Sequence, residues 1–435
     1  MLSPQPMKRV ALQLFRIAML VAIAWVLRDH AVRARVESLR PVSLAEVQSI
    51  FPVATAIRMD AGPRGGWHVV GSGGEEIGYV LQTAPLSDGI IGYRGWSNAL
   101  ILFTPEQRVL GVRIRASQDT TEHVADVRAD RSFLKTWNGQ SWEQVAGKLP
   151  EEAGIEGVSG ATMTSMAVAE GIVRRLRAAT SAEAEAALPA RPVRWRAHDV
   201  GLAAVVLAGL VLAFTGTHGR AWLRRLFQLV VVVYVGFVGG DLLAQSLMLG
   251  WAANGVPWRT APALALLLAA ALLVPWATGK PLYCQQLCPH GHAQEWLARV
   301  APKRWRFAIP RDIAAGLRWL PSLTLACILV VVMLILPCDL AGFEPFDAYL
   351  VKSAGFATLF VAVSGLVASC FVPMAYCHYG CPTGALLNFV RSRGSADRFG
   401  RRELAAVILF VLACLLSWAS VPFNEWLQSA SADWL

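Results

Sequence analysis

Two short stretches of this sequence repeat the same pair of thiols. The pattern Tyr-Cys-x-x-x-Cys-Pro-x-Gly occurs at Tyr283–Gly291 and returns at Tyr376–Gly384. Each copy follows a long apolar segment, so the two copies occupy equivalent places in the chain. A duplicated thiol pair of this kind predicts two halves of one metal site, whose ligands would be Cys284, Cys288, Cys377 and Cys381.

The spacing of the thiols favours an iron–sulfur centre. Cys-x-x-x-Cys-Pro is the closing part of the run with which bacterial ferredoxins hold iron through thiolates. Proline ends the local turn, and the glycine two residues later lets main-chain amides approach sulfur. Two alternatives stay open, a closed structural zinc site and incidental burial of small apolar cysteines. We predict a [4Fe–4S] centre for the repeated motifs and incidental roles for Cys327, Cys370 and Cys414.

A second stretch that could do chemistry precedes a predicted helix at about residues 164–178. The residues Glu156-Gly157-Val158-Ser159-Gly160-Ala161-Thr162 are small or polar, and the helix that follows is apolar on one face. A helix N-terminus presents free backbone amides and the positive end of the helix dipole. This stretch is therefore suited to holding a phosphate group.

The composition places most of the chain in a membrane. Of 435 residues, 55% are hydrophobic and only 16% are charged, which is too apolar for a soluble protein of this size. The formal charge of +10 lies mainly beside the apolar segments, where arginine and lysine meet anionic headgroups. We therefore expect a lipid bilayer as the partner of these basic residues, and no nucleic acid.

Seven apolar segments approach the length that crosses ~30 Å of hydrocarbon. They lie at 9–27, 200–216, 229–249, 261–277, 319–337, 354–373 and 404–421. The first is predicted to be an uncleaved anchor within residues 1–30. The other six form an all-α polytopic membrane domain over residues 197–435.

The distribution of basic residues predicts the orientation of these segments. Arginine and lysine gather in alternate connections, for example at residues 299–311 and 391–402. By the positive-inside rule these connections are cytoplasmic. Both cysteine motifs would then lie in cytoplasmic loops of a bacterial inner-membrane protein, and residues 31–196 would lie outside. Within the third segment, Asp241 is a candidate for proton handling, because an intramembrane carboxylate is rarely incidental; its alternative role is an interfacial helix cap.

Residues 31–196 have the composition of a soluble domain. Short alternating runs, at 67–70, 77–81 and 99–103, are separated by glycine, proline, aspartate and serine and predict strands. The helix after residue 164 completes a small α+β domain.

Ser159-Gly160-Ala161-Thr162, with Glu156 before it, resembles the flavinylation motif of FMN-binding domains in Rnf and sodium-translocating NADH:quinone reductase subunits. This resemblance implies a covalent FMN on Thr162 through a phosphoester, attached by a flavin transferase. Ser159, Gly160, Ala161 and Thr164 would complete the cofactor-binding residues. Glu156 stands where the motif usually has aspartate.

The arrangement of an exported FMN domain followed by two Cys-x-x-x-Cys-Pro motifs resembles the NosR family, and the membrane half resembles NapH-type proteins. NosR proteins continue into a cytoplasmic ferredoxin domain that this sequence lacks, so the resemblance implies a soluble ferredoxin-type partner. It also implies electron transfer from quinol or a cytoplasmic donor to FMN and then to an extracytoplasmic reductase or its maturation system. A quinone is the candidate carrier across the ~30 Å between the two centres. A redox sensor without sustained flux and a zinc-containing scaffold remain alternatives.

Overall fold

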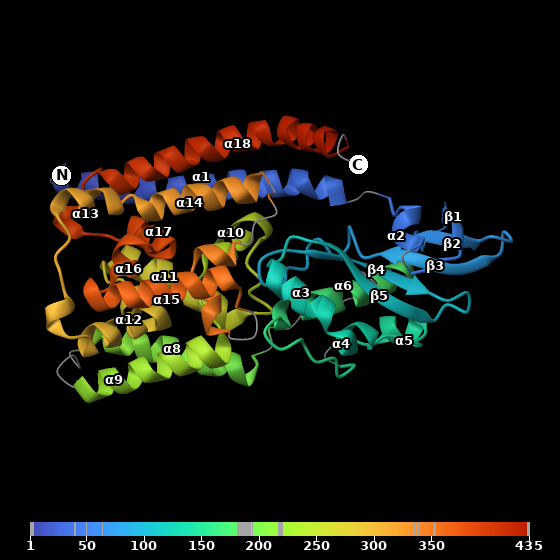
Figure 1. The fold of residues 1–435 in the computed structure, drawn as a ribbon, viewed down its shortest axis with the longest axis horizontal. Coiled ribbons are helices and arrows are strands. Elements are labelled where there is room, and N and C mark those ends of the chain that lie inside the picture. The colour runs from blue at the N-terminus through green and yellow to red at the C-terminus, as the bar shows by residue number, and fades with distance from the viewer. Residues whose placement is uncertain are drawn as a thin grey trace. The chain divides into compact units, whose positions relative to one another are not determined.

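A computed structural model describes most of the chain (Figure 1). The described residues are 4–38, 41–48, 50–62, 64–150, 152–180, 193, 195–215, 221–334, 336, 340–350 and 354–432. They form two compact units, one of Ala31–Pro192 and one of Met1–His30 together with Val193–Leu435. Each unit has its own architecture.

The unit Ala31–Pro192 is built on a five-stranded antiparallel sheet in which neighbours in sequence are neighbours in space. Its strands are β1 (Ala54–Met59), β2 (Trp67–Gly71), β3 (Glu76–Gln82), β4 (Ser97–Phe103) and β5 (Val109–Ser117). Its helices are α2 (Leu44–Gln48), α3 (Thr121–Ala129), α4 (Arg131–Lys135), α5 (Trp142–Gly147) and α6 (Thr162–Thr180). The predicted strands and the predicted helix after residue 164 are all confirmed.

Both faces of this sheet are covered, which explains the continuous apolar run of β4. Successive side chains of a strand point to opposite faces. Ala99 and Ile101 pack in the core that includes α6, whereas Leu100 and Leu102 pack in a second core with Val47 of α2. All seven residues of β4 are buried as a result. The sheet therefore holds the N-terminal end of α6 on a rigid support.

The unit Met1–His30 with Val193–Leu435 is helical. Its longer helices are α1 (Pro4–Ser38), α8 (Ala197–Phe214), α9 (Ala221–Val230), α10 (Gln245–Asn254), α11 (Pro262–Thr278), α12 (Pro289–Val300), α14 (Leu320–Met333), α15 (Phe356–Phe371) and α18 (Arg401–Ala432). Shorter helices are α13 (Arg311–Leu317), α16 (Ala375–Tyr379) and α17 (Pro382–Val390), and π-helical segments cover Val231–Gly239 and Tyr283–Leu287.

Among the described residues, five helices are long and apolar enough to cross a bilayer. They cover Lys8–Arg33, Ala197–Phe214, Ala221–Gly239, Arg311–Met333 and Arg401–Ala419. Two further predicted segments form the shorter apolar helices α11 and α15, of 17 and 16 residues. A helix of 16 residues is about 24 Å long. Five helices thus support a multi-pass membrane protein. The predicted number of seven spans is not confirmed, because α11 and α15 are shorter than the other five.

The third predicted segment, 229–249, is wrong as one continuous helix. Its span ends at Gly239, and Gly240 takes a left-handed conformation with φ of 68°. Residues 240–244 are irregular, and α10 begins only at Gln245. Glycine adopts positive φ without a steric penalty, so the Gly239-Gly240 pair ends the helix here. Hydropathy alone does not detect such a break, because the residues on both sides remain apolar.

A buried ion cluster joins the first helix to the last. Arg16 of α1 is fully buried, and its guanidinium pairs with Asp397 at 2.9 Å and with Glu403 at 2.7 Å. Arg402 contacts the same two carboxylates at 2.5 and 2.9 Å. The cluster thus contains two positive and two negative side chains. Burial by itself raises the pKa of Asp397, but the hydrogen bonds from Arg16 and the Arg393 amide, together with the positive charges of Arg16 and Arg402, lower it to about 2.

We expect Arg16→Met to destabilise the membrane unit by about 3–5 kcal/mol, because removing one member of a buried ion pair leaves its partner uncompensated. Thermal unfolding in detergent would measure this loss. Arg28→Met is the matched control, since Arg28 is an exposed residue on the same helix. Equal losses for the two variants would contradict a structural role for the cluster.

Candidate functional site

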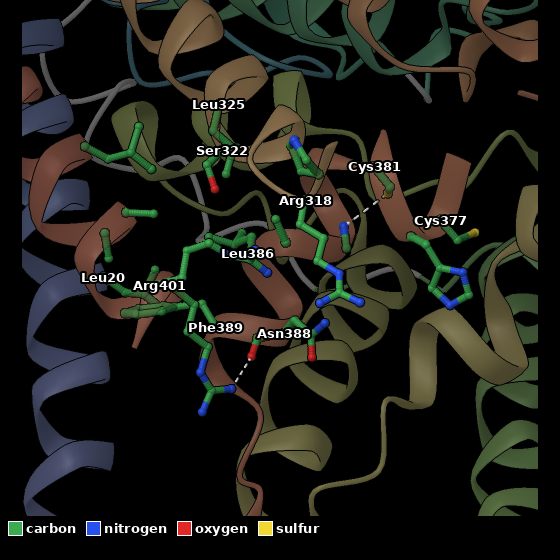
Figure 2. A pocket seen from close by; sticks show the side chains of 18 of the residues that line it. Leu20, Arg318, Ser322, Leu325, Cys377, Cys381, Leu386, Asn388, Phe389 and Arg401 are labelled. Carbon is green, nitrogen blue, oxygen red and sulfur yellow. Dashed lines mark hydrogen bonds between the residues drawn. The ribbon is translucent and has the colours of Figure 1, made fainter. Parts of the chain in front are cut away.

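Each cysteine motif forms the start of a short helix. Cys288 is the N-cap of α12, and its sulfur accepts a hydrogen bond from the backbone amide of Gly291 at 3.4 Å. Cys381 is the N-cap of α17 and accepts from Gly384 at 3.1 Å (Figure 2). Proline follows both cysteines at the first helical position, where its missing N–H costs nothing. The repeated sequence therefore folds into a repeated geometry that directs backbone amides at sulfur.

The two motifs come together in the fold. Burial raises the pKa of the Cys284, Cys288 and Cys377 thiols to about 12, and raises that of Cys381 above its usual range. The negative charge of a neighbouring cysteine contributes to each increase, and the neighbour of Cys288 is Cys377 from the other motif. No three of the described His, Cys, Asp and Glu side chains already surround a common point as a metal shell. To bind a metal centre, the four sulfurs would therefore have to move closer together and release their protons.

Gln294 completes the surroundings of the sulfurs and is a residue that the sequence analysis did not single out. Its side-chain amide donates to the sulfur of Cys377 at 3.2 Å, and its oxygen accepts from Ser369 of α15 at 2.9 Å. Gln294 and Ser369 are both buried. Gln294 lies six residues after Cys288, on the face of α12 that packs against α15, and nothing in the motif itself marks this position.

We expect Gln294→Leu to lower the midpoint potential of an iron–sulfur centre at these cysteines by on the order of 50 mV. Donors to sulfur stabilise the extra negative charge of the reduced state, and about 59 mV corresponds to tenfold in a one-electron equilibrium. A redox titration followed by electron paramagnetic resonance measures the shift. Gln285→Leu is the control, because Gln285 is exposed. An unchanged midpoint potential in Gln294→Leu would contradict the expectation that Gln294 raises the potential of the centre.

Residues of both motifs contact the interior of apolar helices. A Cβ on Gly365, well inside α15, would lie 3.4 Å from the imidazole of His290. A Cβ on Gly236, inside the span Ala221–Gly239, would lie 3.3 Å from Pro289. The chain after α11 therefore turns back between the helices. Positive-inside counting assigns a loop to one side, but it does not detect a loop that re-enters the bundle.

The segment of residues 341–349 meets residues of both cysteine motifs. Glu344, 3% exposed, accepts a hydrogen bond from Thr383 at 2.6 Å and another from the backbone amide of Gln245. Tyr349 hydrogen-bonds with His290 at 3.2 Å. Burial raises the pKa of Glu344 to about 7 despite these donors. Thr383 follows Cys381 by two residues, so Glu344 lies close to the thiols.

Asp241 lies directly after the helix break and pairs with a histidine. Its carboxylate is 2.7 Å from Nε2 of His198, and the hydroxyl of Tyr234 donates to the backbone oxygen of His198 at 3.1 Å. The side chain of Asp241 is 13% exposed. This arrangement is compatible with either proton handling or the stabilisation of an interrupted helix.

In the sheet unit, Thr162 is the first residue of α6 and its side chain is half-buried. Its hydroxyl donates to the backbone oxygen of Val158 at 3.2 Å, and a Cβ on Gly157 would come within 2.6 Å of its methyl group. Gly160 has a φ of 86°, which brings the chain into the helix. Gly157 thus leaves room for the Thr162 side chain at the N-terminus of this helix. Ala161 is 2% exposed, and Ser159 is exposed.

Thr164, which is predicted to be a cofactor-binding residue, contacts an aspartate in the folded chain. It is fully buried, and its hydroxyl donates to Oδ2 of Asp119 at 2.7 Å. Asp119 also accepts from the backbone amides of Tyr93 and Arg94 at 3.0 and 2.7 Å. This one carboxylate ties the turn Gly92–Gly95 to the start of α6. The sequence alone indicated no role for Asp119, because its partners are 25, 26 and 45 residues away.

Comparison with known proteins assigns both regions to described domains. The 4Fe-4S binding domain family matches residues 260–308 and 354–402, and the FMN-binding domain family matches residues 92–177. Protein NirI of Paracoccus denitrificans is 30% identical over 210 residues, which are 46% of this chain and 27% of NirI. The putative electron transport protein YccM of Escherichia coli is 29% identical over 140 residues, 29% of this chain and 39% of YccM. This chain thus aligns with less than half the length of either relative. No solved structure matches the chain.

The residues in both regions fit the groups that these families bind. Four thiols, with backbone amides aimed at two of the sulfurs, are the kind of ligand set that an iron–sulfur centre uses once the thiols have closed around it. A Cβ on Gly384 would lie 3.4 Å from the sulfur of Cys381. Glycine at this position therefore leaves room for the hydrogen bond from its own amide to that sulfur. Thr162 is the first residue of α6, and the free backbone amides of a helix N-terminus suit a phosphate-bearing flavin.

Proposed function

We propose that this chain, a distant homologue of NirI and YccM with an FMN-binding domain and 4Fe-4S motifs, transports electrons across a bacterial inner membrane. The observation that supports this most strongly is the contact between the two cysteine motifs, whose His290 and Tyr376 rings pack edge to face with centres 5.3 Å apart, in a chain that also carries an FMN-binding domain. In this proposal a [4Fe–4S] centre is held by Cys284, Cys288, Cys377 and Cys381. FMN is joined to Thr162 by a phosphoester that a flavin transferase forms.

The cofactors supply one-electron and two-electron redox chemistry, and the protein supplies their positions and electrostatic surroundings. Gly291, Gly384 and Gln294 donate hydrogen bonds to three of the four sulfurs. Asp119 holds the Gly92–Gly95 turn against the start of α6. Asp241 with His198 is the proposed place for the protons that accompany electron transfer.

The donor in this proposal is quinol or a cytoplasmic ferredoxin-type protein, and the acceptor is an extracytoplasmic reductase or its maturation system. A quinol releases two electrons and two protons when it is oxidised, so the protein must also give those protons a route. Pro289 and His290, which follow Cys288, lie beside Gly236 and Gly365 inside apolar helices. An electron that reaches this motif has therefore already entered the helical bundle. This supports transfer through the membrane rather than along its surface.

Stopped-flow spectroscopy of the purified, cofactor-loaded chain tests the proposal. Addition of a reduced quinol analogue or a reduced ferredoxin should bleach the flavin absorption at a rate compatible with respiratory turnover. The matched variant Cys377→Ser should retain flavin but lose this reduction. Flavin reduction that is equally fast without the cysteine site, or that is too slow for turnover, would contradict electron transport through the site and would favour a sensor.

A further inference from the structure

A cavity of about 190 Å³ lies beside the second cysteine motif (Figure 2). Its walls come from α1, α14, α16, α17 and α18, and Cys377 and Cys381 line one side. The other walls also contain the polar residues Ser322, His378 and Asn388, but most of their residues are of two kinds. Arginines lie together at the ends of helices, and apolar side chains lie along the membrane spans.

The charged side chains that line this cavity are positive. Among the residues that the structure describes, the lining includes Arg318, Arg393, Arg401 and Arg402 but no aspartate or glutamate. Asp397 and Glu403, which contact Arg402, are already occupied by the buried cluster with Arg16. The lining therefore contains more positive charge than this part of the protein neutralises.

Two of these arginines have no carboxylate of their own. Within the described part of the chain, neither Arg318 nor Arg401 forms an ion pair, and both side chains line this same cavity. Arg401 lies 5.7 Å from the ring centre of Trp319, which holds its guanidinium at the cavity edge. Two guanidiniums on the wall of one cavity supply N–H donors that match the oxygens of a phosphate.

The apolar lining indicates what carries that phosphate. Leu20 and Ile23 belong to the span Lys8–Arg33, Leu325 to Arg311–Met333, and Leu409 to Arg401–Ala419. These side chains continue the cavity along helices that face hydrocarbon. Arg318 and Arg401 lie at the ends of the helices α13 and α18, where headgroups are expected. A free phosphate would use the arginines but leave this apolar lining in contact with water.

We propose that the Arg318–Arg401 cavity binds one anionic phospholipid, with its phosphate on the two guanidiniums and an acyl chain against Leu20, Ile23 and Leu409. The bound lipid would cover the side of Cys377 and Cys381 that faces the cavity. The site thereby differs from the cysteine site itself, and the proposal does not depend on which donor or acceptor the protein uses.

Native mass spectrometry of the full chain in a neutral detergent tests this. Three probes are compared: phosphatidylglycerol, phosphatidylcholine with the same acyl chains, and inorganic phosphate. We expect one phosphatidylglycerol per chain to bind at least about tenfold more tightly than either of the others. Arg318→Gln and Arg401→Gln should each weaken its binding about tenfold, since a charge-assisted hydrogen bond contributes roughly that factor.

Arg304→Gln is the matched control, because Arg304 is an exposed arginine in the connection before α13 and lies outside the cavity lining. It should leave the tight binding unchanged. Equal affinity for phosphatidylcholine, or unchanged phosphatidylglycerol binding in the Arg318→Gln/Arg401→Gln double variant, would overturn the site. Inorganic phosphate that binds as tightly as phosphatidylglycerol would overturn the lipid as its occupant.

Discussion

Replacing Cys288 and Cys381 together by serine should remove essentially all of the iron, from about four atoms per chain in the parent protein. The expected loss is specific, because serine can still cap α12 and α17 through its hydroxyl oxygen. Removing one ligand from each motif leaves only two thiolates for a centre that needs four. Metal analysis together with visible absorption measures the outcome.

Cys327→Ser is the control for this experiment. Cys327 is an exposed residue of the apolar helix α14, so its removal should leave the iron content unchanged. Zinc in place of iron in the parent protein would support a structural metal site. Iron that remains bound in the double variant would show that the centre lies elsewhere.

Thr162→Val should abolish covalent flavin while leaving the sheet unit folded. Valine has the same shape as threonine but lacks the hydroxyl that a phosphoester requires. The fold should tolerate the change, because the Thr162 hydroxyl donates a single hydrogen bond, to the backbone oxygen of Val158. After coexpression with a flavin transferase, the denatured protein should show no flavin fluorescence on a gel. Circular dichroism would verify that the fold is retained.

Thr164→Val separates attachment from architecture. The Thr164 hydroxyl binds Asp119, so this variant should keep its covalent flavin but lose about 1–3 kcal/mol of stability, because a buried carboxylate loses a donor. A fluorescent Thr162→Val band combined with a dark Thr164→Val band would move the attachment to Thr164.

Local patterns predicted the elements of the sheet unit well. The run Ala99–Phe103 predicts β4, and the small residues before Thr162 predict the start of α6. Both predictions depend only on residues that are neighbours in the sequence. The membrane segments were predicted with less success. The Gly239-Gly240 break divides an apolar run that hydropathy averages into one helix, and α15 is shorter than its apolar sequence suggests.

The reactive groups of this protein can be recognised without a structure: four thiols in a repeated motif, a threonine at the start of a helix, and enough apolar length for several membrane spans. The residues that surround those groups became visible only in the folded chain. Gln294 reaches Cys377 across 83 residues, Glu344 reaches Thr383 across 39, and Asp119 reaches Thr164 across 45. Contacts of this kind depend on how helices and strands pack, and packing between distant segments leaves no periodic signature in either segment.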